Sequence, residues 1–513
     1  MTAPSLISRR TLTSTTGAMS LATAIGVPWR VATAQSTPVA TLAELTIDLA
    51  GTPESIDPAL AYSARDWSIV HSIYDSIVQF GPDGSIESLA AESFTTDDNT
   101  VFEVRLRSGL TFHDGTPVTA AAISRAVTYL VESGSDASSL FAGITSVEEG
   151  DDGLTARIVC GQPSPWLPAQ LAPWLVLLPD GFTHDQALAN PVGSGPYRVE
   201  SIEEGNAITL AGNPDYTWGS PKGNPIAERV TYRFVPELST RIADLVSGSS
   251  QIVTEVPMDQ FASIDGAGAS AVEVSTVASA FVRIASDAAP FDRVEVRQAL
   301  NHAIDVQSIA SSLVSSQAVR LGSIFPDERS MGYDANLAPY TYDPDLARQL
   351  LSDAGYGDGF AAELELTTGG RTDIAEVIAA QLAEVGIELT VRVLEYTEFN
   401  ATWSDTAAAP LRLVTWGPLY DPHTLLGLVF DSEGYLSRFE SADVDSLIRG
   451  AAVETDQEAR AGLYRALNAV MSDQAPAIFL WNLSSGYGVA PEAGQWRPRG
   501  DDYVIPTADG TES

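Results

Sequence analysis

The feature that most constrains the fold is the alternation of strand and helix patterns along the chain, without an internal repeat. Residues 45–50 and 101–106 alternate apolar and polar side chains as strands do, whereas residues 67–80 carry apolar side chains at helical spacing. Helices and strands interleaved over the whole length predict an α/β fold built in layers. Further helices are expected from about residue 120, capped by Thr119, at 294–306, at 342–353 with Asp343 as N-cap, at 373–385 and at 455–474, and further strands at 363–367, 387–393 and 411–415.

Length and charge limit the class of protein. The chain has 513 residues, more than one ordinary domain holds, so two or three domains are expected. It carries 67 acidic and 28 basic residues, a net charge of -39, and Lys222 is the one lysine. Such a surface repels phosphate backbones and anionic membranes, which argues against a nucleic-acid partner. The single cysteine, Cys160, excludes an intramolecular disulfide and a cysteine-only metal cage.

The N-terminal 34 residues have the order of a signal peptide. Two arginines, Arg9 and Arg10, precede an apolar stretch at 17–29, and residues 32–34 read Ala-Thr-Ala, a typical cleavage site. The paired arginines predict the twin-arginine (Tat) export route and a periplasmic or extracellular location. A short membrane anchor is the alternative. No cysteine follows the apolar stretch, so the usual bacterial lipid anchor is excluded. Residues 35–44 are expected to form a flexible leader.

No motif of catalysis was found in the sequence. It contains no HExxH zinc motif, no GxxxxGK[ST] phosphate loop and no GxSxG nucleophile elbow. The expectation is therefore a protein that is not an enzyme and holds no cofactor. An exported hydrolase stays open as the alternative from a different class, because 67 carboxylates can supply a catalytic pair somewhere.

Seven stretches, taken together and in order, resemble the family 5 solute-binding proteins that serve peptide, opine and nickel ABC importers. The likeness runs from about residue 45 to residue 490. The stretches are LTIDLAGTPESIDPAL at 45–60, IYDSIVQFGPDGSI at 73–86, VRLRSGLTFHDGTPVTA at 104–120, PVGSGPY at 191–197, NPDY at 213–216, VRQALNHAID at 296–305 and YDPDLARQLL at 342–351.

The resemblance implies a two-lobed fold of the type II periplasmic-binding-protein class that closes on its solute by a hinge. Lobe I is expected at 45–275, with an extra subdomain at about 63–185, and lobe II at 276–479. Residues 480–513 return to lobe I and end in an acidic tail. The implied function is capture of a small solute, by a monomer, for delivery to the permease and ATPase subunits of an ABC importer.

The stretch TWGPLYDPH at 415–423 is the candidate site. It follows a predicted strand, and α/β proteins bind ligands at strand ends. It resembles the nickel-importer pattern Trp-Gly-x-x-Tyr-Asp-Pro-His, in which the tryptophan and tyrosine wall the solute cavity. Carried over, these positions are Trp416 and Tyr420, with Asp421 beside them. From the first lobe, Tyr62 and Trp67 occupy positions that face the cleft in the family, with core packing as the alternative.

The solute class stays open between a peptide or opine and a metal chelate such as nickel with its chelator. Peptide-binding relatives carry an aspartate where this chain has Leu419. Nickel-binding relatives use a histidine near the position of Gly434 and arginines in the segment 171–179, and this chain has neither. His423 is a weak candidate metal ligand, with a structural histidine beside Asp421 as the alternative.

Two further stretches look like sites and have structural alternatives. His113, in a turn-rich loop, is expected to be structural. The Gly-Ser-Gly-Pro stretch at 193–196 is similar to a phosphate cradle, but no helix pattern follows it, which favours a tight turn.

Overall fold

The computed structural model describes residues 41–135 and 137–508. The predicted signal peptide at 1–34 and the end of the acidic tail lie outside these residues. The predicted leader is wrong at its C-terminal end, because strand β1 already begins at Leu42. Within the described part of the chain, no helix is both long and apolar enough to cross a bilayer.

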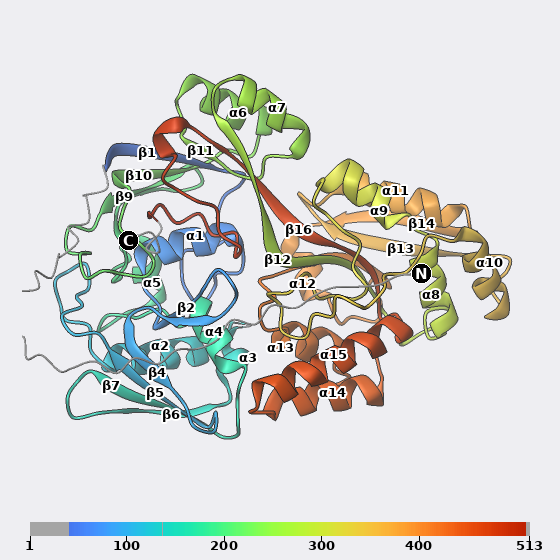
Figure 1. The fold of residues 1–513 in the computed structure, drawn as a ribbon, viewed down its shortest axis with the longest axis horizontal. Coiled ribbons are helices and arrows are strands. Elements are labelled where there is room, and N and C mark those ends of the chain that lie inside the picture. The colour runs from blue at the N-terminus through green and yellow to red at the C-terminus, as the bar shows by residue number, and fades with distance from the viewer. Residues whose placement is uncertain (1–40, 136, 509–513) are drawn as a thin grey trace, which may run out of the picture. The chain divides into compact units, whose positions relative to one another are not determined.

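The largest element of the described chain is a ten-stranded mixed sheet, in the order β14-β13-β15-β12-β16-β11-β1-β10-β9-β8 (Figure 1). A four-stranded antiparallel sheet, β4-β5-β7-β6, and the pair β2-β3 accompany it. The strands are β1 (Leu42–Leu49), β2 (Val78–Phe80), β3 (Ile86–Ser88), β4 (Ala91–Thr95), β5 (Val101–Leu106), β6 (Ile144–Glu149), β7 (Thr155–Cys160), β8 (Tyr197–Glu203), β9 (Ala207–Gly212), β10 (Ala227–Phe234), β11 (Ile252–Val253), β12 (Ser270–Ile284), β13 (Phe360–Thr367), β14 (Ile387–Leu394), β15 (Leu411–Trp416) and β16 (Ala477–Val489).

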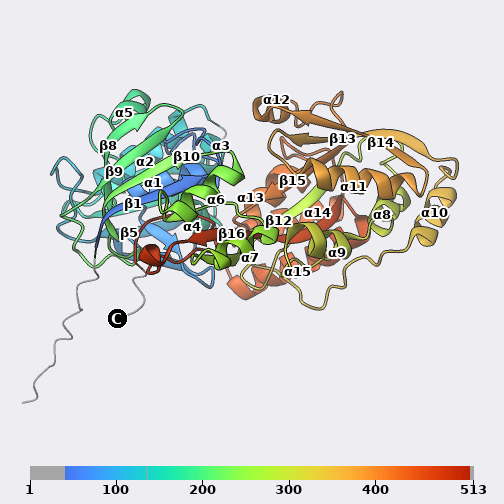
Figure 2. The same cartoon turned by 90° about the horizontal axis from the view of Figure 1, so that it is seen from above.

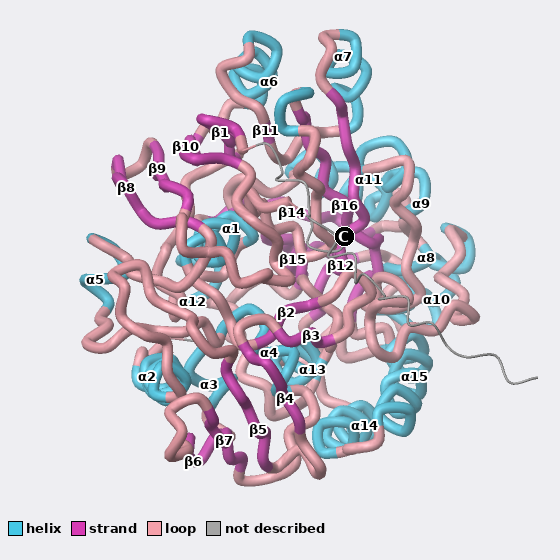
Figure 3. Tube along the Cα trace, turned by 60° about the vertical axis from the view of Figure 1, so that its left-hand side comes forward, coloured by secondary structure: helices cyan, strands magenta, loops and turns pink. Residues whose placement is uncertain are grey.

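Helices lie between the strands along the chain, and Figure 3 separates the two kinds of element by colour. The helices are α1 (Ala64–Ile73), α2 (Ala121–Glu132), α3 (Ala137–Phe141), α4 (Leu167–Trp174), α5 (His184–Ala189), α6 (Leu238–Ser247), α7 (Phe261–Gly266), α8 (Val294–His302), α9 (Val306–Ile309), α10 (Pro344–Asp353), α11 (Thr372–Ala383), α12 (Tyr396–Ala401), α13 (His423–Leu425), α14 (Ala442–Val453) and α15 (Gln457–Gln474). The predicted α/β class is thereby confirmed, and Asp343 caps α10 as expected by accepting from the Leu346 amide.

Three local predictions are wrong. The helix expected at 67–80 ends at Ile73, because the Lys222 ammonium donates to the carbonyls of His71 and Tyr74 at its C-terminus and pairs with Asp75. The helix expected at 294–306 ends at His302, and a second helix, α9, begins at Val306 with Asp305 as its N-cap. Thr119 does not cap α2, whose N-cap is Ala120 and has no side-chain cap bond.

Three large hydrophobic cores hold the described chain together. The first packs α1, α2 and α4 around β1, β5 and β10 and includes residues 487–505 near the C-terminus. The second lies between α8, α10, α11 and one face of the sheet, and the third between α12–α15 and the other face (Figures 1 and 2). Strand β12 is buried on both faces, since Val282 belongs to the second core and Phe281 to the third.

Strands β12 and β16 are the long antiparallel pair in the middle of the ten-stranded sheet. Near the first core, the N-terminal half of β12 at 270–275 pairs with the C-terminal half of β16 at 484–489. Their other halves pair between the second and third cores at 281–283 and 477–479. The register shifts twice in between, at Ser275/Ser279 and at Ser279/Phe281, so the pairing is irregular where the strands pass from one core to the others.

Candidate functional site

Three aromatic side chains, one of them a member of the first core, meet edge to face. Trp174 lies between Tyr62, at a ring-centroid distance of 5.5 Å, and Trp67, at 4.8 Å. Trp67 is 5 % exposed and belongs to the core, whereas Tyr62 is 38 % exposed. The two predicted first-lobe residues are therefore close together, but the tyrosine presents far more surface to solvent than the tryptophan.

Asp66 determines where Tyr62 lies. Ser63 and Asp66 form a capping box at the start of α1, in which each side chain accepts from the other residue's amide. The same buried carboxylate accepts from the amides of Tyr62, at 2.9 Å, and Glu54, at 2.8 Å. The loop before α1 is thus held by a single aspartate, which fixes the backbone that carries Tyr62.

The predicted stretch 416–423 begins where β15 ends. Trp416 is half-buried and pairs across the sheet with Ser279. Leu419 is buried in the third core, and its amide donates to Val277 at 2.6 Å. Tyr420 is 6 % exposed, and desolvation by burial raises its pKa, so the phenol is neutral at physiological pH.

Asp421 is fully engaged in a buried ion pair. Its two carboxylate oxygens accept from the Arg460 guanidinium at 2.5 and 2.9 Å, and Oδ1 also accepts from the His423 amide. The Arg460 side chain is 1 % exposed and also donates to the carbonyl of Ala451 and to the Tyr464 hydroxyl. The pair ties the stretch to α15.

His423 stacks on Trp166 of the first core, with ring centroids 4.4 Å apart and planes 14° apart. Burial lowers the pKa of His423 to about 4, so the imidazole is neutral at physiological pH. Its Nδ1 has no hydrogen-bond partner in the described chain. Among residues 41–135 and 137–508, no group of three or more His, Cys, Asp and Glu side chains is arranged to hold a metal ion.

The stretch that follows β15 meets the first core at several points. The ring of Tyr420 lies 4.3 Å from that of Phe80, and a side chain at Gly84 would collide with Tyr420. Four residues after Tyr420, the hydroxyl of Thr424 accepts a hydrogen bond of 2.6 Å from the side-chain amide of Gln170. The predicted site segment therefore sits where the first and third cores come together.

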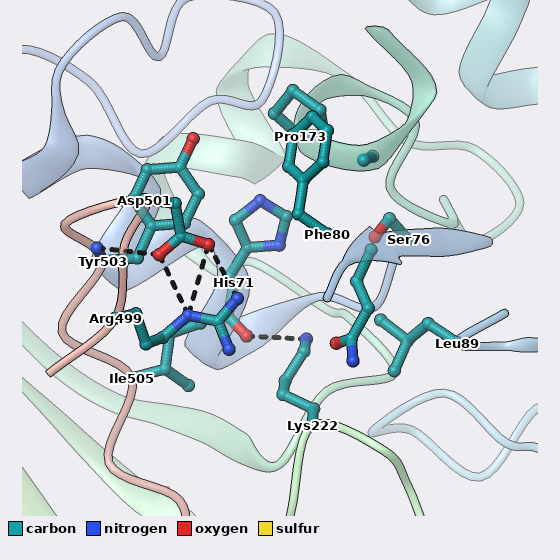
Figure 4. Close-up of a pocket in the computed structure, with 12 residues that line it drawn as sticks. His71, Ser76, Phe80, Leu89, Pro173, Lys222, Arg499, Asp501, Tyr503 and Ile505 are labelled. Carbon is teal, nitrogen blue, oxygen red and sulfur yellow. Dashed lines mark hydrogen bonds and ion pairs between the residues drawn. The ribbon is translucent and has the colours of Figure 1, made fainter. Parts of the chain in front are cut away.

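A small pocket lies beside this contact (Figure 4). Phe80 lines it and carries the ring on which Tyr420 packs. The other lining residues come from α1, the β2–β3 region, α4, the loop that holds Lys222 and the C-terminal segment: His71, Ser76, Gln79, Leu89, Ala172, Pro173, Lys222, Arg499, Asp501, Tyr503 and Ile505.

Each positively charged side chain that lines this pocket forms an ion pair with a carboxylate. Lys222 pairs with Asp75 at 2.6 Å, both side chains being 2 % exposed, and Arg499 pairs with Asp501 at 2.7 Å. Burial keeps the pKa of His71 well below its usual value, so this ring is neutral. The pocket is thus apolar on Phe80 and its neighbours and electrically balanced elsewhere, which suits a neutral or zwitterionic group better than a net charge.

Sequence reasoning found part of this arrangement. Trp67 and Tyr62 lie together, and Tyr420 lies against the first core. The described contacts do not join Trp416 to the first-core rings. The residues missed are Phe80, Trp166, His71, Tyr503 and the Arg499–Asp501 pair. Phe80, Trp166 and Tyr503 have the character of ordinary core residues, and His71 is a buried residue of α1. Arg499 and Asp501 lie ten and twelve residues beyond the end of β16, so no local pattern marks them.

The loop that carries His113 packs against the Gly-Ser-Gly-Pro stretch at 193–196. The His113 ring contacts the carbonyl of Gly195 and accepts from the amide of Gly193. A side chain at either glycine would collide with the backbone of Ile73. These contacts account for the two glycines and the histidine without a ligand.

Known proteins resemble this chain over most of its length. The probable D,D-dipeptide-binding periplasmic protein DdpA of Escherichia coli strain K12 is 24% identical over 476 residues, which cover 85% of this chain and 88% of the relative. The DppA periplasmic binding protein of Helicobacter pylori, solved with the peptide STSA, superposes with a TM-score of 0.80 at 21% identity, covering 92% of this chain and 99% of that one.

A nickel-binding protein has a similar fold. NikA of Staphylococcus aureus, solved with Ni(L-His)2, superposes with a TM-score of 0.77 at 20% identity, covering 91% of this chain and 99% of that one. The model of the bacterial extracellular solute-binding proteins, family 5 Middle, matches residues 85–436. The chain therefore belongs to the family 5 bacterial extracellular solute-binding proteins, and its fold is that of the type II periplasmic binding proteins.

Proposed function

We propose that this protein is exported through the Tat route, captures a small solute as a monomer and delivers it to the permease and ATPase of an ABC importer. The observation that carries the proposal is the contact between aromatic side chains of two cores, Tyr420 with Phe80 and His423 with Trp166, in a chain of this family. The proposed walls of the solute site are the rings of Tyr62, Trp67 and Trp174 on one side and of Trp416 and Tyr420 on the other. A solute enclosed between two separately built walls is what a capture protein requires.

The hinge of the proposed capture lies in β12 and β16. The proposed lobes are 45–275 and 276–479, with an extra subdomain at about 63–185 and a return to lobe I from residue 480. The two register shifts between Ser275 and Phe281 support this boundary, because irregular pairing is where a strand pair bends most easily. Closure would then change the distance between the aromatic walls.

The proposed solute belongs to the peptide and nickel class. Leu419, at the position of the peptide-binding aspartate, is buried and contacts Val277, so it offers no carboxylate for an α-ammonium. The balanced charges of Lys222 and Arg499 favour a solute without net charge in their pocket. A metal chelate, the alternative to a peptide or opine, stays open on the resemblance of the stretch 416–423.

The proposed contacts follow from exposure. Tyr62 and Trp416 present ring surface and would pack on the solute, while Trp67 and Tyr420 would support them from below. Direct contact between Asp421 and the solute stays a prediction, and its two bonds to Arg460 support a role in holding the wall.

The test combines two measurements on protein purified under native conditions. Mass spectrometry identifies the molecule that copurifies, and indole fluorescence follows its rebinding to stripped protein, where closure should change the signal and saturate at one solute per chain. Trp416→Phe keeps an aromatic wall and serves as the control for Trp416→Ala. Saturable binding that is unaltered in both variants would exclude this wall from the site.

The hydrolase alternative is tested separately. The protein should bind and turn nothing over in a panel of peptides, esters and glycosides. Catalytic turnover that a single substitution in the pocket abolishes would replace the capture function with an enzymatic one. For export, Arg9→Lys with Arg10→Lys should leave the precursor in the cell. Normal yield of mature protein outside would exclude the Tat route.

A further inference from the structure

Arg283 of β12 is a buried cation with no acceptor. The residue is 1 % exposed, and Nε, Nη1 and Nη2 all lack a hydrogen-bond partner among the residues that the structure describes. An unpaired guanidinium in a protein interior is unfavourable by several kcal/mol, since it has lost its contact with bulk water and has no counter-charge. Desolvation and the neighbouring Arg412 lower its pKa to about 9, which still leaves it charged at neutral pH.

The register of the sheet shows why no carboxylate reaches it. Arg412 of β15 stands directly opposite Arg283, and Glu365 of β13 stands opposite Arg412 on its other side. One row across three strands therefore carries one carboxylate and two guanidiniums on the same face. Glu365 Oε2 accepts from Arg412 at 2.7 and 2.9 Å, and Oε1 accepts from Arg392 at 3.1 Å, so both oxygens are taken.

The third guanidinium of the cluster is also paired elsewhere. Arg438 makes two bonds of 2.9 Å to Asp287 and donates to the carbonyls of Asp405 and Ala408. The cluster of Arg283, Arg412 and Arg438 with Glu365 and Asp287 thus has one positive charge more than it has negative charges. That excess is on Arg283, because the other two are bonded.

A second donor without an acceptor lies at the same place. The guanidinium of Arg283 is 5.9 Å from the ring centroid of Trp403, and Nε1 of this buried ring has no partner in the described chain. The ring face attracts the cation, but such a contact contributes roughly 0.5–2 kcal/mol and gives the N–H group nothing to donate to. An anion would satisfy both groups and neutralise the excess charge.

We propose that Arg283 and the indole N–H of Trp403 hold a small inorganic monovalent anion, chloride being the ordinary one, inside the third core. Water could accept the hydrogen bonds but leaves the charge uncompensated. The ion would be part of the folded structure of this region and independent of the solute site.

Another buried arginine shows how the chain satisfies such a group without an ion. Arg297 is 6 % exposed, and no carboxylate accepts from it among the residues that the structure describes. Its Nε, Nη1 and Nη2 donate instead to the carbonyls of Gln474 and Phe291. Arg297→Met is therefore the matched control for Arg283→Met. Both substitutions remove a buried guanidinium and keep the length of the side chain, and only the second removes the proposed ion.

The first test is the anion dependence of stability, at constant ionic strength, in sodium chloride, bromide, formate and gluconate. Binding to the folded state alone should raise the folded-to-unfolded ratio about tenfold between one tenth of and ten times the chloride Kd. Wild type and Arg297→Met should show this rise with chloride and bromide, and Arg283→Met should not. With 67 acidic residues against 28 basic ones, the surface itself attracts few anions.

Several outcomes would overturn the proposal. Equal responses in Arg283→Met and wild type would place the ion elsewhere, and no difference between chloride and gluconate would mean that water alone solvates the group. Stabilisation by formate and not by chloride would mean a carboxylate site. If Arg283→Met does not fold, anomalous scattering from bromide-soaked crystals of the wild type decides, with a peak between Arg283 and Trp403 expected and its absence contrary to the proposal.

Discussion

The two proposed walls of the solute site are held in place by different interactions. The wall at Tyr62, Trp67 and Trp174 is made of rings packed edge to face on the first core. The wall at Trp416–His423 is a strand-end loop held by the Asp421–Arg460 ion pair. Apolar packing tolerates small shifts, whereas a buried ion pair needs both partners in place. A substitution that removes one charge of the Asp421–Arg460 pair should therefore displace the second wall, whereas the first wall is held by ring packing.

The largest effect is expected from breaking the ion pair. Arg460→Met leaves Asp421 buried without its partner, so the free energy of unfolding, measured in urea, should fall by roughly 3–5 kcal/mol. The double variant Arg460→Met with Asp421→Leu removes both charges and should recover much of that loss. A double variant as unstable as the single one would mean that packing, and not charge, holds the second wall.

A similar loss, by another mechanism, is expected in the first wall. Trp67 is 5 % exposed, so Trp67→Ala opens a cavity and should lower stability by about 3–5 kcal/mol, with no dependence on pH or salt. Trp67→Phe, which fills most of the space, should lose less. Calorimetry of the solute-free protein measures both, and an unchanged melting temperature in Trp67→Ala would show that the ring is not a core element.

A smaller effect, on binding alone, is expected from Trp416→Ala. The ring is half-buried, so its removal should weaken solute binding by roughly 1–3 kcal/mol while the melting temperature of the solute-free protein changes little. Titration calorimetry and unfolding of the same variant separate the two. A large loss of melting temperature with unaltered affinity would assign Trp416 to the core.

The smallest effect is a pH dependence at the contact between the walls. The pKa of His423 is lowered to about 4, below its value of about 6.5 in unfolded chains, so between these values the unfolded state binds more protons. This histidine's share of stability is therefore complete above about pH 6.5 and is lost as the pH falls toward 4. His423→Phe keeps the stack on Trp166 and should show a weaker acid loss. The same substitution at His302, whose ring packs on Tyr340, is the control.

Prediction from sequence succeeded where a pattern is local. Alternation gave β5 at 101–106 without error, and the Asp343-Pro344 pair marked the start of α10. It failed at α1, where the apolar spacing continues past Ile73, because the ammonium that ends the helix comes from Lys222, about 150 positions along the chain. Helical spacing cannot show a hydrogen bond made by a distant residue.

The candidate site divides in the same way. Trp416, Tyr420, Tyr62 and Trp67 were predicted because motif and resemblance point to them, and their contact with a solute stays a prediction. Phe80 and Trp166, which contact the stretch 420–423, have the spacing of ordinary core residues. Asp421 was predicted beside the solute, and only the structure shows that Arg460 takes both of its oxygens.

The sequence by itself determined the class and the character of this protein: an α/β chain of family 5 with an acidic surface, one lysine, and aromatic residues at a strand end. Side-chain types and short-range periodicity carry that information, because they act within a few residues. The tertiary structure decided which charges are paired. Lys222 pairs with Asp75 and Arg460 with Asp421, whereas Arg283 has no hydrogen-bond partner in the described chain. Strand register and core packing decide which charged groups come close, because they bring together residues that are far apart in the sequence.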